Sequence, residues 1–245
     1  MFSIFKKKAN LITDISWLGV DIHSHLLPGI DDGAKDTAEA VSYIKSLQEL
    51  GFSKLICTPH IFTEIYPNTA ATIMPALQLV RDVLKVEKIK MEIEAAAEYM
   101  IDETFSAKGD YLCLPERHLL IEMSYLNETP NIEQVIFDLQ IKGYKVILAH
   151  PERYNFYHMN FNRYHRLKSM GCLFQLNLLS VLGYYGKQVK TAADFLLNQK
   201  YYDFAGTDLH HDKHLITLRN AVHDGTLYGL VGKYEFKNKE FSETK

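Results

Sequence analysis

The stretch WLGVDIHSH, residues 17–25, is a mostly apolar run that ends in polar side chains. Its composition predicts a buried β-strand with a polar end. Side chains two residues apart in a strand project to the same side, so His23 and His25 can face one metal ion. The acidic turn DDG, residues 31–33, follows, and its glycine permits a tight turn that brings Asp32 back over this end of the strand. Taken alone, the DDG motif could also be an ordinary turn.

The same pattern, an apolar strand that ends in a polar residue, recurs along the chain and alternates with helices. Strands are predicted at residues 17–25, 54–60, 91–100, 118–124, 145–150, 173–179 and 203–210. Helices are predicted at residues 36–50, 72–86, 131–142, 161–170, 191–199 and from 214 onward. Strands that are nearly continuous apolar runs, separated by helices, indicate a parallel sheet covered on both faces.

Seven such strands predict an α/β fold, a single distorted TIM-like (β/α)7 barrel. Six of them carry polar side chains at or near their carboxyl ends, where barrels of this kind place their catalytic residues. An open doubly wound sheet is the alternative, but a flat sheet would bring residues from six strands together less easily. The barrel domain is predicted to span residues 16–232, between an N-terminal segment, 1–15, and a loose C-terminal tail rich in lysine and glutamate, 233–245.

Nine side chains at the ends of these strands form a candidate metal site. They are His23, His25, Asp32, His60, Glu98, Glu122, His150, Asp208 and His210. Nine nitrogen and oxygen donors are more than one ion needs, so the set predicts a multinuclear centre. A mixture of histidine and carboxylate without cysteine suits Mn²⁺, Fe²⁺, Co²⁺ or Zn²⁺.

Two of the carboxylates stand in apolar surroundings. Glu98 follows three alanines, whose small side chains let the backbone approach a crowded centre. Because a carboxylate can bridge two ions, Glu98 is the candidate bridge. Glu122 interrupts an apolar strand, where a charge is costly unless it is paired or bound to metal. The signal at His60 is weaker, since a single histidine after a proline could be a loop residue.

Arg153 lies three residues beyond His150 on the same predicted loop. A guanidinium group matches the geometry of phosphate with two parallel hydrogen bonds; the plainer alternative is a surface salt bridge with Glu152 or another carboxylate. A metal centre with excess positive charge attracts a phosphate dianion and lowers the pKa of bound water. Together, these features indicate metal-dependent hydrolysis of a phosphoester.

Composition and missing motifs argue against several other classes of protein. The chain has 245 residues, 47% of them hydrophobic and 23% charged, with a net charge of -3. This is ample for a large core and gives no basic footprint for nucleic acid. Cysteine-dependent phosphatases need C-x5-R, but Thr63, Leu119 and Leu178 stand at the sixth position after the three cysteines. The GxxxxGK[ST] loop of nucleoside triphosphatases is also missing.

The expected location follows from cysteine usage and hydropathy. Three cysteines, none of them in a C-x-x-C pair, argue against a disulfide framework. The N-terminus does not read as a secretory signal, and no segment approaches the ~20 apolar residues of a membrane span. We therefore expect a cytoplasmic protein.

The ordered motifs resemble a known superfamily. The set DIHSH, DDG, TPH, AEY, Glu122, AHPERY and DLH resembles the PHP (polymerase and histidinol phosphatase) superfamily. Within it, DIHSHLLPGIDDGA and AHPERY resemble the bacterial metal-dependent protein-tyrosine phosphatases of capsule and exopolysaccharide clusters, the CpsB/YwqE type. The resemblance runs from residue 17 to residue 211. It implies a seven-stranded barrel of the PHP type, a trinuclear centre with Mn²⁺ favoured, and hydrolysis of phosphotyrosine.

The resemblance also implies roles for single residues. His23, His25, Glu98 and Asp208 would hold one ion, Glu98 would bridge to a second held by His60 and His150, and Asp32, Glu122 and His210 would serve the third. The phosphate-binding arginine of the family maps to Arg153, and His210 or His211 could assist the departing phenolate. Some relatives carry another arginine shortly after the final D-x-H, where this chain has HDKH with Lys213.

The substrate implied by the resemblance is the tyrosine-rich tail of a bacterial tyrosine kinase that controls polysaccharide export. Two other functions stay open. One is a small-molecule phosphatase of the same superfamily, such as one acting on histidinol phosphate. Its pocket should be deep and closed, whereas that of a protein phosphatase should be shallow. The other is a non-catalytic module that binds metal or the polysaccharide machinery.

Overall fold

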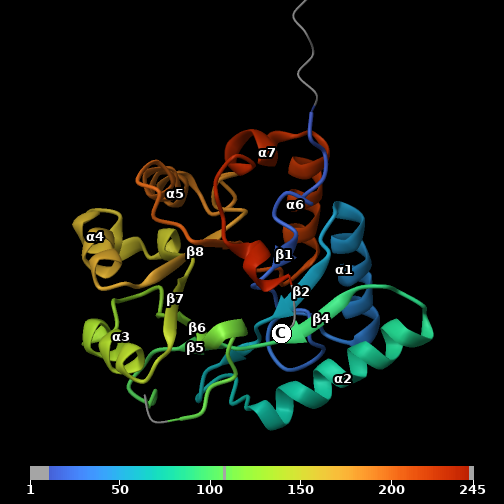
Figure 1. Cartoon of the computed structure of the whole chain (residues 1–245), viewed down its shortest axis with the longest axis horizontal. Coiled ribbons are helices and arrows are strands. Elements are labelled where there is room, and N and C mark those ends of the chain that lie inside the picture. Colours follow the sequence, from blue (N-terminus) through green and yellow to red (C-terminus); the bar gives the residue numbers. More distant parts are fainter. Residues whose placement is uncertain (1–10, 107–108, 243–245) are drawn as a thin grey trace, which may run out of the picture.

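The computed structural model describes residues 11–106 and 109–242, with strands in the middle of the molecule and helices around them (Figure 1). The strands are β1 (Val20–Asp21), β2 (Lys54–Cys57), β3 (His60–Ile61), β4 (Glu92–Ala95), β5 (Glu98–Met100), β6 (His118–Glu122), β7 (Lys145–Ala149), β8 (Leu173–Asn177) and β9 (Phe204–Gly206). The helices are α1 (Thr37–Leu50), α2 (Ala70–Val86), α3 (Ile132–Ile141), α4 (Asn162–Ser169), α5 (Lys187–Asn198), α6 (Asp212–His223) and α7 (Thr226–Val231). Short 3₁₀ helices are η1 (Pro115–Arg117), η2 (Pro151–Arg153), η3 (Asn155–Tyr157) and η4 (Asn238–Phe241).

The first helix begins and ends for local reasons that the sequence shows. Asp36 Oδ1 accepts a hydrogen bond from the N–H of Glu39 (2.9 Å), and Gly51 ends α1 with a left-handed φ of 109°. Both agree with the predicted cap and stop. The helix predicted from 214 onward is divided into α6 and α7, and Gly225 precedes α7 with a left-handed φ of 76°. Across the described ranges, no helix is both long enough and apolar enough to cross a membrane.

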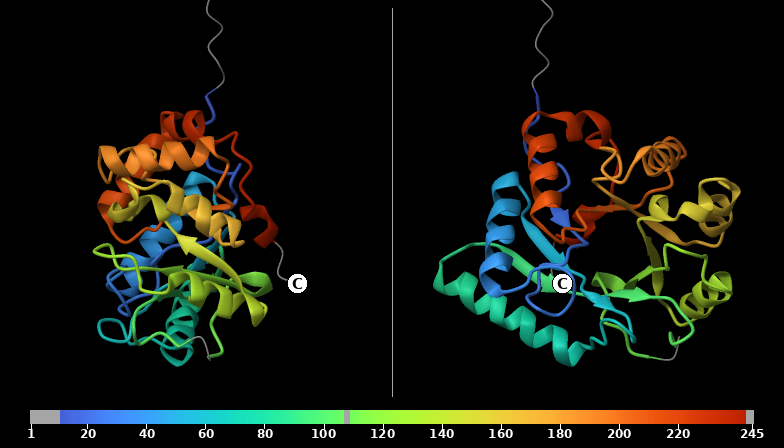
Figure 2. Two further views of the ribbon diagram at one scale, coloured as in Figure 1. Left: turned by 90° about the vertical axis from the view of Figure 1, so that its left-hand side faces the viewer. Right: turned by 180° about the vertical axis from the view of Figure 1, so that it is seen from behind.

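The strands pair in parallel, as predicted, and their sheets together follow one curled surface (Figure 2). There are two sheets, with strand orders β1-β2-β4 and β3-β5-β6-β7-β8-β9. The predicted strand 54–60 divides into β2 and β3 at Pro59, which has no N–H for a neighbouring strand. The predicted strand 91–100 divides into β4 and β5 at the same level. The fold is therefore α/β with a curled parallel sheet, and the flat open sheet does not describe it.

Backbone hydrogen bonds bring the first and last strand segments side by side. The N–H of Asp208 donates to His23 O (2.8 Å), and the N–H of His25 donates to Leu209 O (3.0 Å). Ser24 and Leu209 also form a parallel bridge. Segments from opposite ends of the described chain thus meet at the level of the predicted metal site.

A compact apolar cluster fills the inner side of the curl. Val20 and Ile22, and likewise Ile147 and Ala149, are two residues apart in one strand and therefore project to the same side. The cluster consists of Val20, Ile22, Ile56, Ala96, Leu114, Leu120, Ile147, Ala149, Phe204 and Phe241. A larger cluster joins the sheet to the helices outside it. With the interior filled by apolar side chains, the carboxyl ends of the strands remain for polar ones.

The segment around η4 packs against the amino ends of the strands. Phe241 is fully buried and stacks on Phe204, with ring centroids 5.1 Å apart and 17° between the planes. The buried side-chain amide of Asn238 donates to Val20 O (2.8 Å) and Ala205 O (2.7 Å) and accepts from the N–H of Ala205 (3.0 Å). Asn238 thus links β1 to β9.

This packing differs from the loose tail expected for 233–245, because Asn238 and Phe241 anchor its described part, to residue 242, in the fold. Because the residues next to Asn238 and Phe241 in the sequence are polar, the sequence alone does not identify these two anchors. Residues 243–245 lie outside the described residues. So does most of the predicted N-terminal segment 1–15, in which Ile15 is buried and its N–H donates to Leu50 O (2.8 Å).

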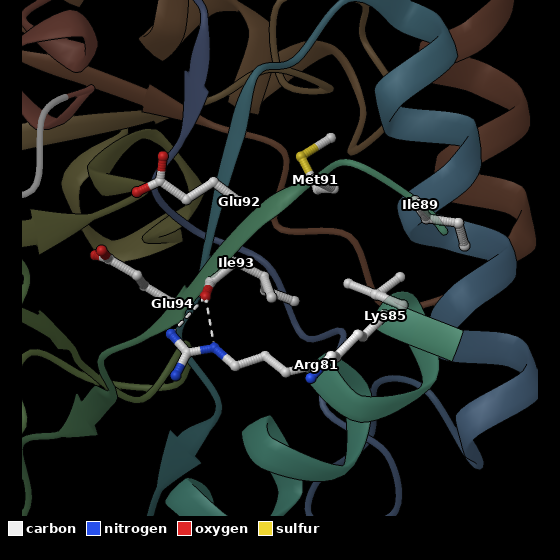
Figure 3. Close-up of a pocket in the computed structure, with 8 residues that line it drawn as sticks. Arg81, Lys85, Ile89, Met91, Glu92, Ile93 and Glu94 are labelled. Carbon is white, nitrogen blue, oxygen red and sulfur yellow. Dashed lines mark hydrogen bonds between the residues drawn. The ribbon is translucent and has the colours of Figure 1, made fainter. Parts of the chain in front are cut away.

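Strand β4 lies at the edge of its sheet, where an open row of backbone groups invites pairing with another chain. The guanidinium of Arg81, from α2, covers this edge. Its Nε and Nη2 donate to Ile93 O at 3.1 and 2.7 Å (Figure 3). A charged side chain therefore occupies one acceptor of this open edge, the carbonyl of Ile93.

We expect Phe241→Ala to lower the free energy of unfolding by about 3–5 kcal/mol, because it leaves a cavity in the interior cluster. Urea denaturation measures the change. Glu240→Ala is the matched control, since Glu240 is exposed in the same turn and should change stability by less than about 0.5 kcal/mol. Equal stabilities of Phe241→Ala and the unchanged protein would show that η4 does not anchor the fold.

Candidate metal centre

The structure brings the nine predicted donors together, and Glu98 lies among them. Its carboxylate is completely buried. Oε2 lies 3.2 Å from His23 Nε2, 3.5 Å from His25 Nε2 and 3.2 Å from His60 Nδ1. Oε1 lies 3.1 Å from His150 Nε2. One carboxylate therefore lies against four histidines, and each of its two oxygen atoms faces at least one of them.

The first donor group has the spacing of a metal site. His23 Nε2 and His25 Nε2 lie 3.3 Å apart, and each lies 3.4 Å from Asp208 Oδ1. Donor atoms that surround one ion tetrahedrally at bond lengths of about 2.1 Å lie ~3.4 Å from one another. Together with Glu98 Oε2, these atoms fit the four ligands of one divalent ion.

A second donor group includes His60 and Glu122. His60 Nδ1 lies 2.9 Å from Glu122 Oε1 and 3.2 Å from Glu98 Oε2, and His150 Nε2 lies 4.0 Å from Glu122 Oε2. Despite these neighbours, the buried His60 Nδ1 makes no hydrogen bond within the described residues. A nitrogen that faces two carboxylates without such a bond has the environment of a metal ligand.

The third donor group lies nearest to solvent. Asp32 Oδ1 lies 3.5 Å from His60 Nε2 and 3.5 Å from His210 Nε2, and its side chain is 52% exposed. His60 thus offers one ring nitrogen to each of two groups. The resemblance implies that Glu122 belongs with Asp32 and His210, whereas the structure places it against His60 Nδ1.

Side chains behind the donors hold the imidazole rings in place. Asp31 Oδ2 accepts from His25 Nδ1 (2.8 Å), and Gln175 Oε1 accepts from His23 Nδ1 (2.8 Å). Such partners fix the tautomer and direct the other nitrogen at the ion. Neither Asp31 nor Gln175 is among the nine donors predicted from the sequence. Gln175 and Asn177 both interrupt the otherwise apolar strand 173–179, so the sequence does not single out Gln175.

Local backbone conformation turns two donors toward the centre. His150 and Asp208 have left-handed φ values of 34° and 49°, which are unfavourable for residues with a Cβ. Gly206 permits the close approach of the neighbouring strand, because a Cβ there would lie 2.6 Å from that of His23. The surrounding fold therefore holds His150 and Asp208 in backbone conformations that residues with a Cβ disfavour.

Neighbouring charges in the centre shift the pKa values of two buried side chains, Glu98 and His25. Burial alone would raise the pKa of Glu98, but His23 and His150 hold it well below its usual range. Burial favours the neutral imidazole of His25, but Asp31 and Asp208 raise its pKa well above the ordinary value. The carboxylate of Glu98 is thus favoured as an anion, and an ion bound by His25 would have to displace a proton from it, so binding should weaken at low pH.

Arg153 pairs with a carboxylate of the centre and not with Glu152. Its Nη1 donates to Asp208 Oδ2 (2.6 Å). The guanidinium lies over the rings of Tyr125 and Tyr185, at 4.7 and 4.3 Å from their centroids, and such contacts orient a planar cation. Glu152 is itself buried and accepts a hydrogen bond from Tyr202 (2.8 Å).

His211 has a structural contact that the sequence does not predict. Its Nδ1 accepts from the N–H of His214 (3.4 Å) and so caps the start of α6. His214 is buried, and its Nε2 lies 3.5 Å from the hydroxyl of Tyr185. Lys213 lies on the exposed face of the first turn of α6.

The donors open into a pocket of about 240 Å³. Six of the nine predicted ligands line it, together with Arg153 and the apolar side chains of Phe62, Ile65, Tyr66, Met100 and Tyr125. A second pocket of about 440 Å³ lies between α2 and β4 (Figure 3). Its carboxylates, Glu92 and Glu94, pair with Lys54 at 2.9 and 3.0 Å, and its lining includes no histidine or cysteine. The chemistry therefore belongs to the first pocket.

Known proteins share this fold and much of this sequence. The family described as "Capsular polysaccharide synthesis, CpsB/CapC" matches residues 19–219. Tyrosine-protein phosphatase YwqE of Bacillus subtilis (strain 168) is 31% identical over 198 residues, which are 79% of this chain and 78% of the relative.

Solved structures extend the likeness. One, from work on YwqE of Bacillus subtilis and CpsB of Streptococcus pneumoniae, "unique metal-dependent tyrosine phosphatases", has a TM-score of 0.73 at 27% identity and covers 86% of this chain and 90% of that chain. A histidinol phosphate phosphatase of Lactococcus lactis, complexed with zinc, L-histidinol and phosphate, has a TM-score of 0.52 at 13% identity and covers 84% of this chain and 93% of that one. The latter likeness shows the fold alone.

We expect Gln175→Ala to weaken Mn²⁺ binding by roughly 10–100-fold, the usual effect of removing a side chain that orients a metal-bound histidine. Titration calorimetry of metal-free protein measures the change. Gln140→Ala is the matched control, because that amide donates to Met170 O from helix α3. Equal Mn²⁺ affinities of Gln175→Ala and the unchanged protein would contradict the orienting role.

Proposed function

The chain belongs to the CpsB/CapC family of capsular polysaccharide synthesis, and on this premise we propose that it is a metal-dependent protein-tyrosine phosphatase. The observation that carries the proposal is a pocket in which metal donors and Arg153 lie side by side. Such a site can bind a phosphate dianion and hydrolyse its ester, which makes the protein a phosphoric monoester hydrolase.

The proposal includes a closed form of the fold, a distorted (β/α)7 barrel of the PHP type over residues 16–232. The hydrogen bonds between the segments around His23 and Asp208 support closure at one end. The amide of Asn238, which bonds to β1 and β9, supports it at the other. The division of strands 54–60 and 91–100 would then be a local distortion of two barrel strands.

We propose three divalent ions, with Mn²⁺ favoured over Fe²⁺, Co²⁺ and Zn²⁺. The donor groups would be His23, His25, Glu98 and Asp208 for the first, Glu98, His60, His150 and Glu122 for the second, and Asp32 and His210 beside His60 for the third. Bound ions of this kind supply a hydroxide near neutral pH and neutralise charge on phosphate oxygens.

The protein's own side chains bind and orient the substrate. In this proposal Arg153 binds phosphate oxygens, and its contacts with the rings of Tyr125 and Tyr185 help to orient the guanidinium. The phenol that leaves has an ordinary pKa of ~10, so a strong general acid is unnecessary. Of the two histidines considered for proton transfer, His210 lines the pocket, whereas His211 Nδ1 is engaged at the start of α6.

The size of the pocket favours a protein substrate. Its volume of about 240 Å³ is below the ~300–1,000 Å³ of pockets that enclose a whole small ligand. It therefore suits the end of a side chain whose backbone stays outside. The proposed partner is the tyrosine-rich tail of a bacterial tyrosine kinase, and the proposed location is the cytoplasm, in keeping with three free cysteines.

The proposal predicts that the purified protein releases phosphate from phosphotyrosyl peptides when Mn²⁺ is added, and that a chelator abolishes the release. His60→Ala should reduce it to background, because His60 contributes donors to two groups. A comparison with histidinol phosphate distinguishes this function from that of a small-molecule phosphatase. Activity that survives both chelation and His60→Ala would refute the metal mechanism.

Arg153→Ala should lower kcat/KM for a phosphotyrosyl peptide by about 10²–10³-fold, the usual loss when one charge-stabilising donor is removed. Arg153→Lys keeps the charge but lacks the planar guanidinium, so its kcat/KM should lie between those of Arg153→Ala and the unchanged protein. Arg166→Ala, on the exposed face of α4, is the control. A kcat/KM unchanged in Arg153→Ala would exclude a role of this residue in phosphate binding.

A further inference from the structure

The pocket at the metal centre has one apolar side. It consists of Phe62, Ile65 and Tyr66, from the loop after β3, and of Met100, at the end of β5. In the sheet, β3 is next to β5, whereas Arg153 follows β7, beyond β6. The apolar residues and the arginine therefore approach the donors from different strands.

The apolar side of the pocket is in direct contact with one of the predicted donors, His60. The ring of Tyr66 stacks on the imidazole of His60, with centroids 5.5 Å apart and 13° between the planes. A substrate that holds its phosphate at the donors would thus project the next atoms of its ester along this side. Ile65, at the rim, is 59% exposed, so part of the apolar surface is open in the free protein.

The loop that carries these residues is held in place without a ligand. Phe62 and Tyr66 exchange backbone hydrogen bonds of 2.9 and 2.8 Å. The amide of Asn68, which is buried, donates to His60 O (3.0 Å) and Ile30 O (2.7 Å). A surface fixed beforehand loses little conformational entropy when a ligand covers it.

We propose that Phe62, Ile65 and Met100 form an aryl-binding surface that receives the phenyl ring of phosphotyrosine and selects aryl over alkyl phosphoesters. The inference rests on the proposed phosphatase function. A phenyl ring gains hydrophobic and edge-to-face contacts with these side chains. An alkyl phosphoester has no ring to cover the surface and gains only the phosphate contacts that both esters share.

The test measures two substrates in one set of variants loaded with Mn²⁺. Ile65→Ala and Phe62→Ala should each lower kcat/KM for a phosphotyrosyl peptide by roughly fivefold to tenfold, with kcat/KM for the phosphoseryl peptide unchanged. Ile65→Leu keeps an apolar side chain of the same size and should retain the aryl preference. Leu79→Ala, an exposed position on α2, is the control.

A binding measurement separates recognition from turnover. Phenylphosphonate and ethylphosphonate carry the same charged head and are not hydrolysed. Ile65→Ala should weaken binding of phenylphosphonate by the same factor as it lowers kcat/KM, and leave binding of ethylphosphonate unchanged. Because Ile65 is largely exposed, this variant tests the surface even where Phe62→Ala disturbs the fold.

The possible results distinguish the two proposals. If the wild-type protein hydrolyses phosphotyrosine, and the variants lose activity equally on both peptides or on neither, the aryl-binding surface is overturned and the phosphatase function stands. If the Mn²⁺-loaded wild-type protein hydrolyses no phosphotyrosine, the proposed function is overturned, and this inference with it.

Discussion

One buried carboxylate, that of Glu98, imposes the main constraint on this structure. It has no exposed surface and meets nitrogen atoms of four histidines from segments spread along the chain. A carboxylate survives such burial only among positive charges or hydrogen-bond donors. The strands that supply the histidines must therefore end at one height around it. A curled parallel sheet meets this condition, and the three alanines before Glu98 leave room for the approach.

The sequence predicts the donors well because their signals are local. Alternation within one strand identifies His23 and His25, and an apolar run identifies the strand that Glu122 interrupts. The residues that support the site have no such signal. Gln175 and Asn238 bond to partners far away in sequence, and their neighbours do not distinguish them from other polar residues. The missing N–H of Pro59 could have predicted that the strand 54–60 divides there. The positions of its two parts, β2 and β3, depend on the strands beside them, which the local sequence does not show.

The geometry of the donors is maintained by the rest of the fold. His150 and Asp208 adopt left-handed conformations that their own side chains disfavour. The apolar cluster inside the curl and the larger cluster under the helices supply the stability that offsets this strain. Substitutions in either cluster therefore act on the site without touching it, because a shift of one strand end changes the distances among several donors at once.

The position of Asn238 near the end of the described residues determines when, during synthesis, the first and last strands can be linked through it. Every donor lies at or before His210, whereas the amide that joins β9 to β1 at the far end of the strands comes later in the chain. During translation, the ribosome therefore releases all nine predicted donors before the segment that contains Asn238. At that moment the bonds between Asp21 and Thr207 and those around His23 and Asp208 can already form, whereas the bonds of Asn238 cannot. Asn238 can therefore join the first strand to the last only after every predicted donor has been synthesised.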